Sequence, residues 1–380
     1  NLLFAGTELG MYISWNGGKM WQSFQLNLPI TPISDIKISH NDLTIATMGR
    51  SFWVLDDLGL LRQFEGNKTT FKLLTPEDAI IGNWSSQLNY SSENFSGADD
   101  SEGVNPANGI VFYYYLPRNL KNKELSLEIK DEDGNVIRTI NSKSDSNYQR
   151  YPGGPSPEPI LSNKVGLNRF VWDMRHQSLP GIPTAYIEGS YRGHKAMPNL
   201  YSASLKQEDK LSEVSFSILP NPLYNITKEE YLETHKFKII TEANLTDMHT
   251  RVNTLKKIQS QLIKIIKELP EEQKYMGLKS KGEAIILQLK SWDEDMVQRK
   301  SKAYDDVENF PNKFTAEYIF LMNQNDSSIP KLNSASKNRL EELNKEWIEL
   351  KNRSKELIQE VIPAYNKLLW NNEIGALNVK

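Results

Sequence analysis

The sequence predicts a multidomain protein of the β + α class, in which β modules come first and a helical bundle comes last. Three observations on the 380-residue chain carry this prediction. Eighteen of the 21 glycines lie in residues 1–200, so turns are concentrated in the first half. Short strand-like runs cut by turns recur about every ten residues at the start. Beyond residue 227 the apolar residues recur at three and four positions, which is typical of amphipathic helices.

Residues 1–75 are expected to form short antiparallel strands. Runs rich in β-branched and aromatic residues alternate there with turn residues. The expected strands are residues 2–5, 11–15, 21–25, 33–38, 43–47 and 51–55. This regular spacing, with glycine between the runs, favours a sandwich, a barrel or the blades of a propeller.

One motif in this segment is specific. Residues 14–21, Ser-Trp-Asn-Gly-Gly-Lys-Met-Trp, match the Asp-box pattern S-x-D-x-G-x-x-W, with asparagine in the aspartate position. A short Asx side chain bonds the nearby backbone, and glycine accepts a positive φ. We therefore expect Ser14, Asn16 and Gly18 to shape a hairpin with Trp21 packed beneath it. Asn16 is given a structural role and no catalytic one.

Residues 76–108 are expected to form a linker, because most of this stretch is rich in Asn, Ser, Gly and Asp. A second β module is expected over 109–221. It contains a dense aromatic run at 110–116 and later alternating strands that surround an Asp-Gly hairpin signal. The acidic run 131–134 has some features of a calcium loop, but it lacks the third spaced oxygen ligand and the distal glutamate. It is interpreted as a plain hairpin.

Residues 222–380 are expected to form helices. Thr227 and Glu230 have the spacing of a capping box at a helix start, and Pro270 ends or kinks that helix. Further helices are expected at 279–304, about 313–323 and 332–370. A heptad pattern marks the last of them, with Leu340, Leu343, Trp347, Leu350, Leu357 and Val361 apolar and Ser354 polar. Short turns favour an intramolecular antiparallel bundle, and a coiled-coil dimer is the alternative.

Four stretches carry a resemblance to a known family. They are residues 4–14, the Asp-box, residues 28–36 and residues 43–57, which follow one another in order. Together they resemble the last part of the β-propeller in the BNR-repeat, sortilin-like "glycosyl hydrolase" proteins of bacteria. Most members have histidine where this chain has Met48, so the chain departs from the family pattern at that position, and a site that needs the histidine is not expected here. With the weaker matches downstream, the resemblance covers nearly the whole chain.

The resemblance implies a finer architecture. Residues 1–75 would be the last blade or blades of a β-propeller, 109–221 an immunoglobulin-like β-sandwich, and 222–380 the antiparallel helical bundle. A propeller needs at least about four blades. The chain also begins without methionine in a strand-like run. We therefore expect it to be the C-terminal part of a longer protein, or its strands to close with another copy.

The resemblance also implies a function. It suggests a secreted or periplasmic protein that acts on or binds glycans. The full-length protein would be a possible glycoside hydrolase. The alternative is a non-catalytic propeller scaffold or receptor that binds peptide or protein ligands, with a partner protein docked on the helical bundle.

Composition excludes several classes of function. The formal net charge of −3 argues against a general nucleic-acid binder, which needs a basic face. The absence of cysteine removes disulfides, thiolate nucleophiles and cysteine metal sites. No window of about 18 apolar residues exists, so no transmembrane segment is expected.

The visible sequence carries no convincing active site. The weak catalytic candidates are Glu8, Asp56 and Asp57, which are more simply interpreted as strand-end and turn residues. Arg175, His176 and His194 share a Gly/Pro-rich loop region without metal-ligand spacing. His235 and His249 are 14 residues apart on an expected helix, which is no ligand spacing either. The sequence therefore indicates neither a metal site nor a cofactor.

Overall fold

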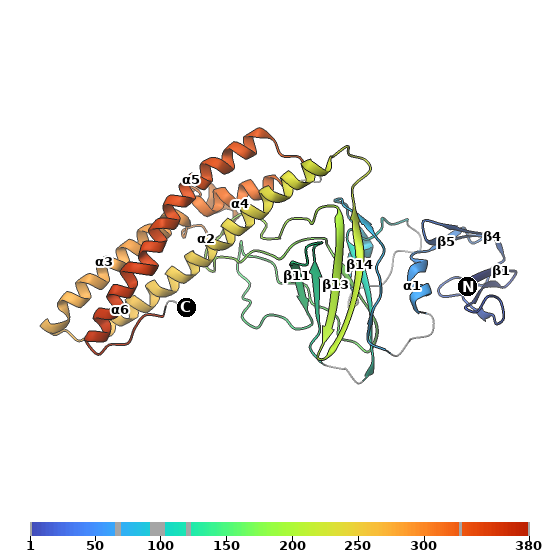
Figure 1. Cartoon of the computed structure of the whole chain (residues 1–380), viewed down its shortest axis with the longest axis horizontal. Helices are drawn as coiled ribbons and strands as arrows, with labels where there is room; N and C mark the ends of the chain where they lie inside the picture. Colours follow the sequence, from blue (N-terminus) through green and yellow to red (C-terminus); the bar gives the residue numbers. More distant parts are fainter. Residues whose placement is uncertain (1, 65–69, 92–102, 119–122, 327–328, 379–380) are drawn as a thin grey trace. The chain divides into compact units, whose positions relative to one another are not determined.

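The computed structural model describes residues 2–64, 70–91, 103–118, 123–326 and 329–378 (Figure 1). The chain divides into two compact units. The first, here called the β unit, comprises residues 1–144, 159–174 and 198–221. The second, the helical unit, comprises residues 145–158, 175–197 and 222–380. The protein is thus of the β + α class, but two segments from the predicted range 109–221 belong with the helices.

The physical reason for this difference is burial of apolar side chains. Leu179, Ile182 and Tyr191 lie in the 175–197 segment and are at most 5% exposed. They belong to the same apolar core as the helices. A boundary at residue 222 therefore leaves part of the helical core out.

The β unit begins with two three-stranded antiparallel sheets, each with its strands in chain order. The first contains β1 (Leu3–Thr7), β2 (Gly10–Ser14) and β3 (Gln22–Ser23). The second contains β4 (Ile33–Ser39), β5 (Asp42–Thr47) and β6 (Phe52–Leu55), and α1 (Leu58–Phe64) follows it. The two sheets share a small apolar core of Met11, Leu28, Leu43, Ile45 and Leu58. The strands expected between residues 2 and 55 thus form close to their expected positions.

The Asp-box forms a bonded turn between β2 and β3. The Ser14 hydroxyl accepts a hydrogen bond from the Gly18 amide at 2.9 Å, and Asn16 Oδ1 accepts one from the Met20 amide at 2.9 Å. Gly18 has a φ of +90°, a conformation that side chains with a Cβ rarely adopt. Trp21 remains 44% exposed, so it is less buried than expected.

This turn allows a direct test of the asparagine. Asn16→Ala removes the acceptor for the Met20 amide and is expected to destabilise the hairpin by about 1 kcal/mol. Asn16→Asp is the matched control, because a carboxylate accepts the same bond and restores the usual pattern. Hydrogen exchange of the Met20 amide should be faster in the alanine variant and unchanged or slower in the aspartate variant. Equal exchange in all three proteins would contradict the role given to Asn16.

The rest of the β unit contains a five-stranded and a three-stranded sheet. The five-stranded sheet has the order β11-β10-β13-β14-β8, and the three-stranded sheet has the order β12-β9-β7. Their strands are β7 (Lys72–Leu73), β8 (Ala79–Ile80), β9 (Ile110–Leu116), β10 (Ser126–Lys130), β11 (Val136–Asn141), β12 (Gly166–Trp172), β13 (Asn199–Gln207) and β14 (Lys210–Leu219). Every second residue of β9 is buried, as its alternation requires.

Aromatic side chains join these two sheets. Phe112 of β9 meets Phe216 of β14 with ring centroids 5.4 Å apart, and Trp172 of β12 meets Tyr201 of β13 at 6.2 Å.

Between β10 and β11, the Asp131 carboxylate accepts hydrogen bonds from the Asp133 and Asn135 amides, so the acidic run 131–134 makes a hairpin turn.

The described residues of the expected linker 76–108 form regular contacts. β8 lies within it and pairs in parallel with β14. The Trp84 indole donates to the Pro106 carbonyl at 2.9 Å, and a short 3₁₀ helix, η1 (Gln87–Asn89), lies between them. Residues 92–102 of this expected linker lie outside the described residues. Its described part is therefore packed onto the β unit, not a free tether.

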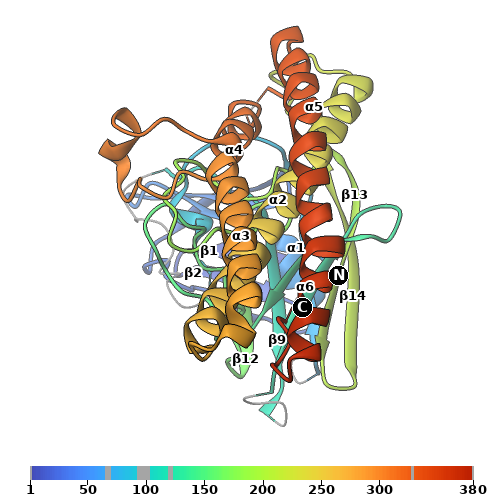
Figure 2. The same cartoon turned by 90° about the vertical axis from the view of Figure 1, so that its left-hand side faces the viewer.

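The helical unit is built from long helices around one apolar core. Its helical elements are α2 (Lys228–Glu268), α3 (Gln273–Met296), η3 (Tyr304–Glu308), α4 (Phe314–Gln324), α5 (Ser334–Glu356), the π-helical turn η4 (Leu357–Val361) and α6 (Ile362–Asn371). A short turn joins α2 to α3, which lie side by side and antiparallel (Figures 1 and 2). No helix in the described part of the chain is both long and apolar enough to cross a membrane.

Helix ends follow local chemistry. Thr227 and Glu230 form the expected capping box, with the Glu230 amide 3.2 Å from the Thr227 hydroxyl. α3 ends at Met296 and not at 304, because Arg299 turns back to bond both oxygens of Asp293 at 2.7 and 2.9 Å. The π turn η4 ends two residues before Pro363, which cannot donate a backbone hydrogen bond.

The heptad pattern of the last helix is buried as expected. Leu340, Leu343, Trp347, Leu350 and Leu357 are buried, and Val361 is partly buried. The polar position Ser354 is fully buried, and its hydroxyl bonds the Lys351 carbonyl at 2.7 Å and Arg251 at 3.2 Å. A polar residue is tolerated in this seam because its hydrogen bonds are satisfied within the unit.

Candidate functional site

The sequence-predicted carboxylates lie on different sheets of the β unit. Glu8 lies in the exposed turn between β1 and β2. Asp56 and Asp57 follow β6, where the Asp57 carboxylate accepts the Leu60 amide at 3.1 Å. Partial burial raises the pKa of Asp57, and the backbone amides of Leu60 and Gly59 oppose that rise. Asp57 therefore begins α1, and this structural role accounts for its position.

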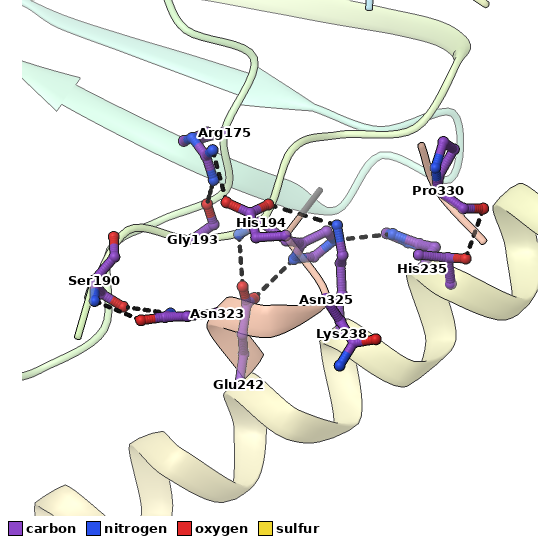
Figure 3. Close-up of polar contacts among 12 residues, drawn as sticks. Arg175, Ser190, Gly193, His194, His235, Lys238, Glu242, Asn323, Asn325 and Pro330 are labelled. Atoms are coloured by element: carbon purple, nitrogen blue, oxygen red, sulfur yellow. Dashed lines mark hydrogen bonds and ion pairs between the residues drawn. The ribbon is translucent and has the colours of Figure 1, made fainter. Parts of the chain in front are cut away.

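A group of histidines in the helical unit forms a second candidate site. One ring nitrogen from each of His176, His194 and His235 lies within 4.8 Å of the other two. We call these three residues the histidine cluster. The His176 and His194 rings stack with centroids 3.9 Å apart, and His194 Nε2 lies 3.0 Å from His235 Nδ1 (Figure 3).

Backbone pairing brings the first two histidines together. The His176 amide donates to the His194 carbonyl at 2.9 Å, next to a bridge between Arg175 and Lys195. A Cβ atom at position 193 would lie 2.4 Å from the His176 carbonyl oxygen. Glycine at 193 is therefore needed for the two stretches to approach this closely.

Helix α2 supplies the third histidine and two charged groups. His235, Lys238 and Glu242 are three and four residues apart, so they lie along one face of the helix. The Glu242 carboxylate accepts the His194 amide at 2.6 Å and lies 2.9 Å from His194 Nδ1 (Figure 3). When Glu242 is ionised its carboxylate only accepts, so His194 then carries its proton on Nδ1 and directs the lone pair of Nε2 toward His235.

Burial sets the charge of this pair. The His194 side chain is 2% exposed, and burial lowers its pKa well below the usual 6.5, assisted by the charges of His235 and Lys238. Burial also raises the pKa of Glu242 to about 7, opposed by the His194 amide bond. The neutral imidazole of His194 stabilises the fold above pH 6.5 and loses this effect as the pH falls. The raised pKa of Glu242 acts oppositely, stabilising below pH 4.5 and losing its effect as the pH rises through about 7.

A group of ion pairs between two buried cations and a partly exposed carboxylate supports the cluster. Asp326 accepts Arg175 Nη2 at 2.7 Å and lies 3.5 Å from Lys238 Nζ. Arg175 also donates to the Gly193 carbonyl at 2.8 Å. Burial lowers the pKa of Lys238, and the charge of Asp326 opposes that shift. These contacts fix the stretches that carry His176 and His194 against α2.

A side-chain clamp holds the same segment farther along. Asn323, near the end of α4, accepts the Ser190 amide at 2.6 Å and donates to the Ser190 carbonyl at 3.0 Å (Figure 3). The histidine cluster is therefore built on an irregular segment that two helices hold in place.

Sequence reasoning placed His176 and His194 near each other but left His235 apart. The contact between His194 and His235 joins residues 41 positions apart in the chain, so no local spacing in the sequence predicts it. One feature of the sequence does indicate a polar site on α2. Lys238 continues the buried face of Tyr231, Thr234 and Thr241 on α2, and a charge on a buried helix face requires a partner nearby.

The chemistry of the cluster is that of nitrogen donors. Neutral imidazole rings accept a proton or ligate a transition-metal ion, and a carboxylate on the far nitrogen is the usual orienting partner of such a ring. Cysteine is absent from the chain, so imidazole and carboxylate groups are the strongest metal ligands that its side chains provide.

No protein-family model matches this chain, and no curated protein shows significant sequence similarity to it.

Proposed function

We propose that this chain is the C-terminal part of a BNR-repeat, sortilin-like propeller protein. The support is the pair of three-stranded antiparallel sheets in chain order, one of which carries the bonded Asp-box. The remaining blades come from further sequence or from another copy, since at least about four are needed. On the same resemblance, β9 to β14 correspond to the immunoglobulin-like sandwich, and the protein is secreted or periplasmic.

Within this proposal, the propeller binds glycans without hydrolysing them. The observation that carries this choice is the role of Asp57, whose carboxylate accepts the Leu60 amide at the start of α1. A glycosidase needs two carboxyl groups about 5–9.5 Å apart across a sugar. Glu8 lies in an exposed turn of the other sheet, whereas Asp57 is held by its backbone contact at the start of α1. Hydrolysis would have to rely on blades outside this chain.

The helical unit is proposed to dock a partner protein. Large apolar side chains are exposed on its surface, among them Phe320 of α4 and Trp370 of α6, which are 61% and 74% exposed. Such side chains are common in protein interfaces. This part of the proposal depends on the same resemblance as the propeller.

The test is a glycan panel applied to the full-length protein. We expect measurable binding to at least one glycan class and no release of reducing ends from any of them. Glu8→Gln, Asp56→Asn and Asp57→Asn variants should bind the same glycans as the parent. Turnover that any of these variants abolishes would establish a hydrolase and overturn the binding proposal. Binding to peptides alone would favour the receptor alternative.

A further inference from the structure

We propose that the histidine cluster binds one divalent transition-metal ion. His194 Nε2 is the central ligand, His176 and His235 supply the other two nitrogens, and Glu242 orients His194 from behind. Imidazole donors suit ions such as Zn²⁺, Co²⁺, Ni²⁺ and Cu²⁺. The inference is independent of the proposed glycan binding, because every residue it uses belongs to the helical unit.

Ligand spacing is the first argument. Two imidazole nitrogens at about 2.0–2.1 Å from a tetrahedral ion lie about 3.3 Å apart. His194 Nε2 and His235 Nδ1 are 3.0 Å apart, so a small outward movement places both on one ion. With His176 included, one ring nitrogen of each histidine lies within 4.8 Å of the other two. His176 must turn out of its stack on His194, and it is the ring with the largest movement to make.

Orientation of the central ligand is the second argument. A metal-ligating histidine commonly donates its other N–H to a carboxylate, which fixes its tautomer and ring plane. His194 has this arrangement, with Nδ1 2.9 Å from Glu242 Oε2 and its own amide 2.6 Å from Glu242 Oε1. The Nε2 lone pair is thereby aimed at His235. In the metal-free protein His235 Nδ1–H donates to that lone pair, and in the metal-bound protein its proton moves to Nε2.

Charge balance is the third argument. Arg175 and Lys238 are cations near the cluster and would repel a metal ion if they stood alone. Asp326 contacts both of them, at 2.7 and 3.5 Å, and Glu242 adds a second carboxylate. With Glu242 ionised, two cations and two carboxylates leave no local excess of positive charge against the ion. A site with three histidine ligands also leaves a coordination position open for water or a small ligand, as in sites that perform chemistry.

The experiment uses the full chain without a polyhistidine tag, titrated with Co²⁺ and followed by its visible d–d absorption. We expect one Co²⁺ per chain, displaced by Zn²⁺. His176→Gln and His235→Gln should each weaken binding at least about tenfold, and Glu242→Gln about 10–100-fold. His40→Gln is the matched control, because His40 is an exposed residue of the β unit and should bind as the parent does. Circular dichroism melts establish that each variant is folded.

A second measurement needs no variant. Imidazole nitrogen NMR of the parent chain should show the resonances of His194 Nε2 and His235 Nδ1 shifting on addition of Zn²⁺, with His40 and His249 unchanged. Failure to take up Co²⁺ would overturn the proposal. So would equal uptake by the His176→Gln and His235→Gln variants. In either case the cluster serves only to hold the 175–197 segment on α2. Glycan binding is measured separately, so failure of one proposal leaves the other standing.

Discussion

Trp292→Ala is expected to destabilise the helical unit by about 3–5 kcal/mol, the range for removing a large aromatic side chain from a core. Trp292 lies on α3, is fully buried and belongs to the core that all the long helices share. Its indole also donates to the Leu350 carbonyl of α5 at 2.8 Å, so the variant both leaves a cavity and removes a hydrogen bond between two helices. Folded domains are stable by only about 5–15 kcal/mol, so this change removes a large share.

The measurement is urea unfolding followed by the helical circular dichroism signal. Trp370→Ala is the matched control, because the same substitution on α6 removes a side chain that is 74% exposed. It is expected to change stability by less than about 0.5 kcal/mol. Trp292→Phe should fall between the two, since it keeps most of the ring and loses the N–H. Equal stabilities for the two alanine variants would mean that α3 does not pack as described.

His249→Asn is expected to remove the part of the helical unit's acid sensitivity that comes from one buried imidazole. His249 lies on α2 with no exposed surface, and its Nδ1 lies 2.7 Å from the Pro180 carbonyl. Nε2 has no hydrogen-bond partner among the described residues. Burial lowers the pKa of this imidazole from 6.5 to about 4, opposed by the bond to Pro180. A second proton on this ring would therefore be buried without an acceptor.

The sign of the effect follows from these values. The neutral form of His249 stabilises the unit fully above pH 6.5, and this contribution is lost as the pH falls through about 4. The loss is about 3 kcal/mol at 1.36 kcal/mol per pKa unit. Asparagine keeps a donor near the position of Nδ1 and does not titrate. Unfolding free energies measured between pH 7 and pH 4 should thus fall more steeply in the parent.

Glu242 and His194 also contribute to the pH dependence, but they are present in both proteins. Their contributions therefore cancel when the two pH profiles are subtracted. Parallel profiles would show that His249 is not the titrating group.

The regular elements could be predicted because their signals are local. The alternation of Phe112 and Tyr114 in β9, and the capping box at Thr227, each depend on residues a few positions apart. Their strand and helix form where expected. The end of α3 could not be predicted, because it depends on a partly buried ion pair between Asp293 and a residue beyond the helix.

The histidine cluster and the 175–197 segment show where sequence reasoning stops. Ile182, Ile187 and Tyr191 are buried in the helical core without any helical or strand period. Their burial is decided by residues that come much later in the chain. The same holds for His235, which meets His194 only because α2 passes beside that segment.

The discontinuous helical unit has a consequence for synthesis. The chain emerges from the ribosome N-terminus first, so Leu179, Ile182 and Tyr191 appear before α2 and every later helix. These three side chains are buried only against helices that begin at residue 228. Until then the growing chain carries a segment of exposed apolar surface between strands that can already pair. The helical unit is therefore completed late, and a chain truncated before α2 should be prone to aggregation or dependent on a chaperone.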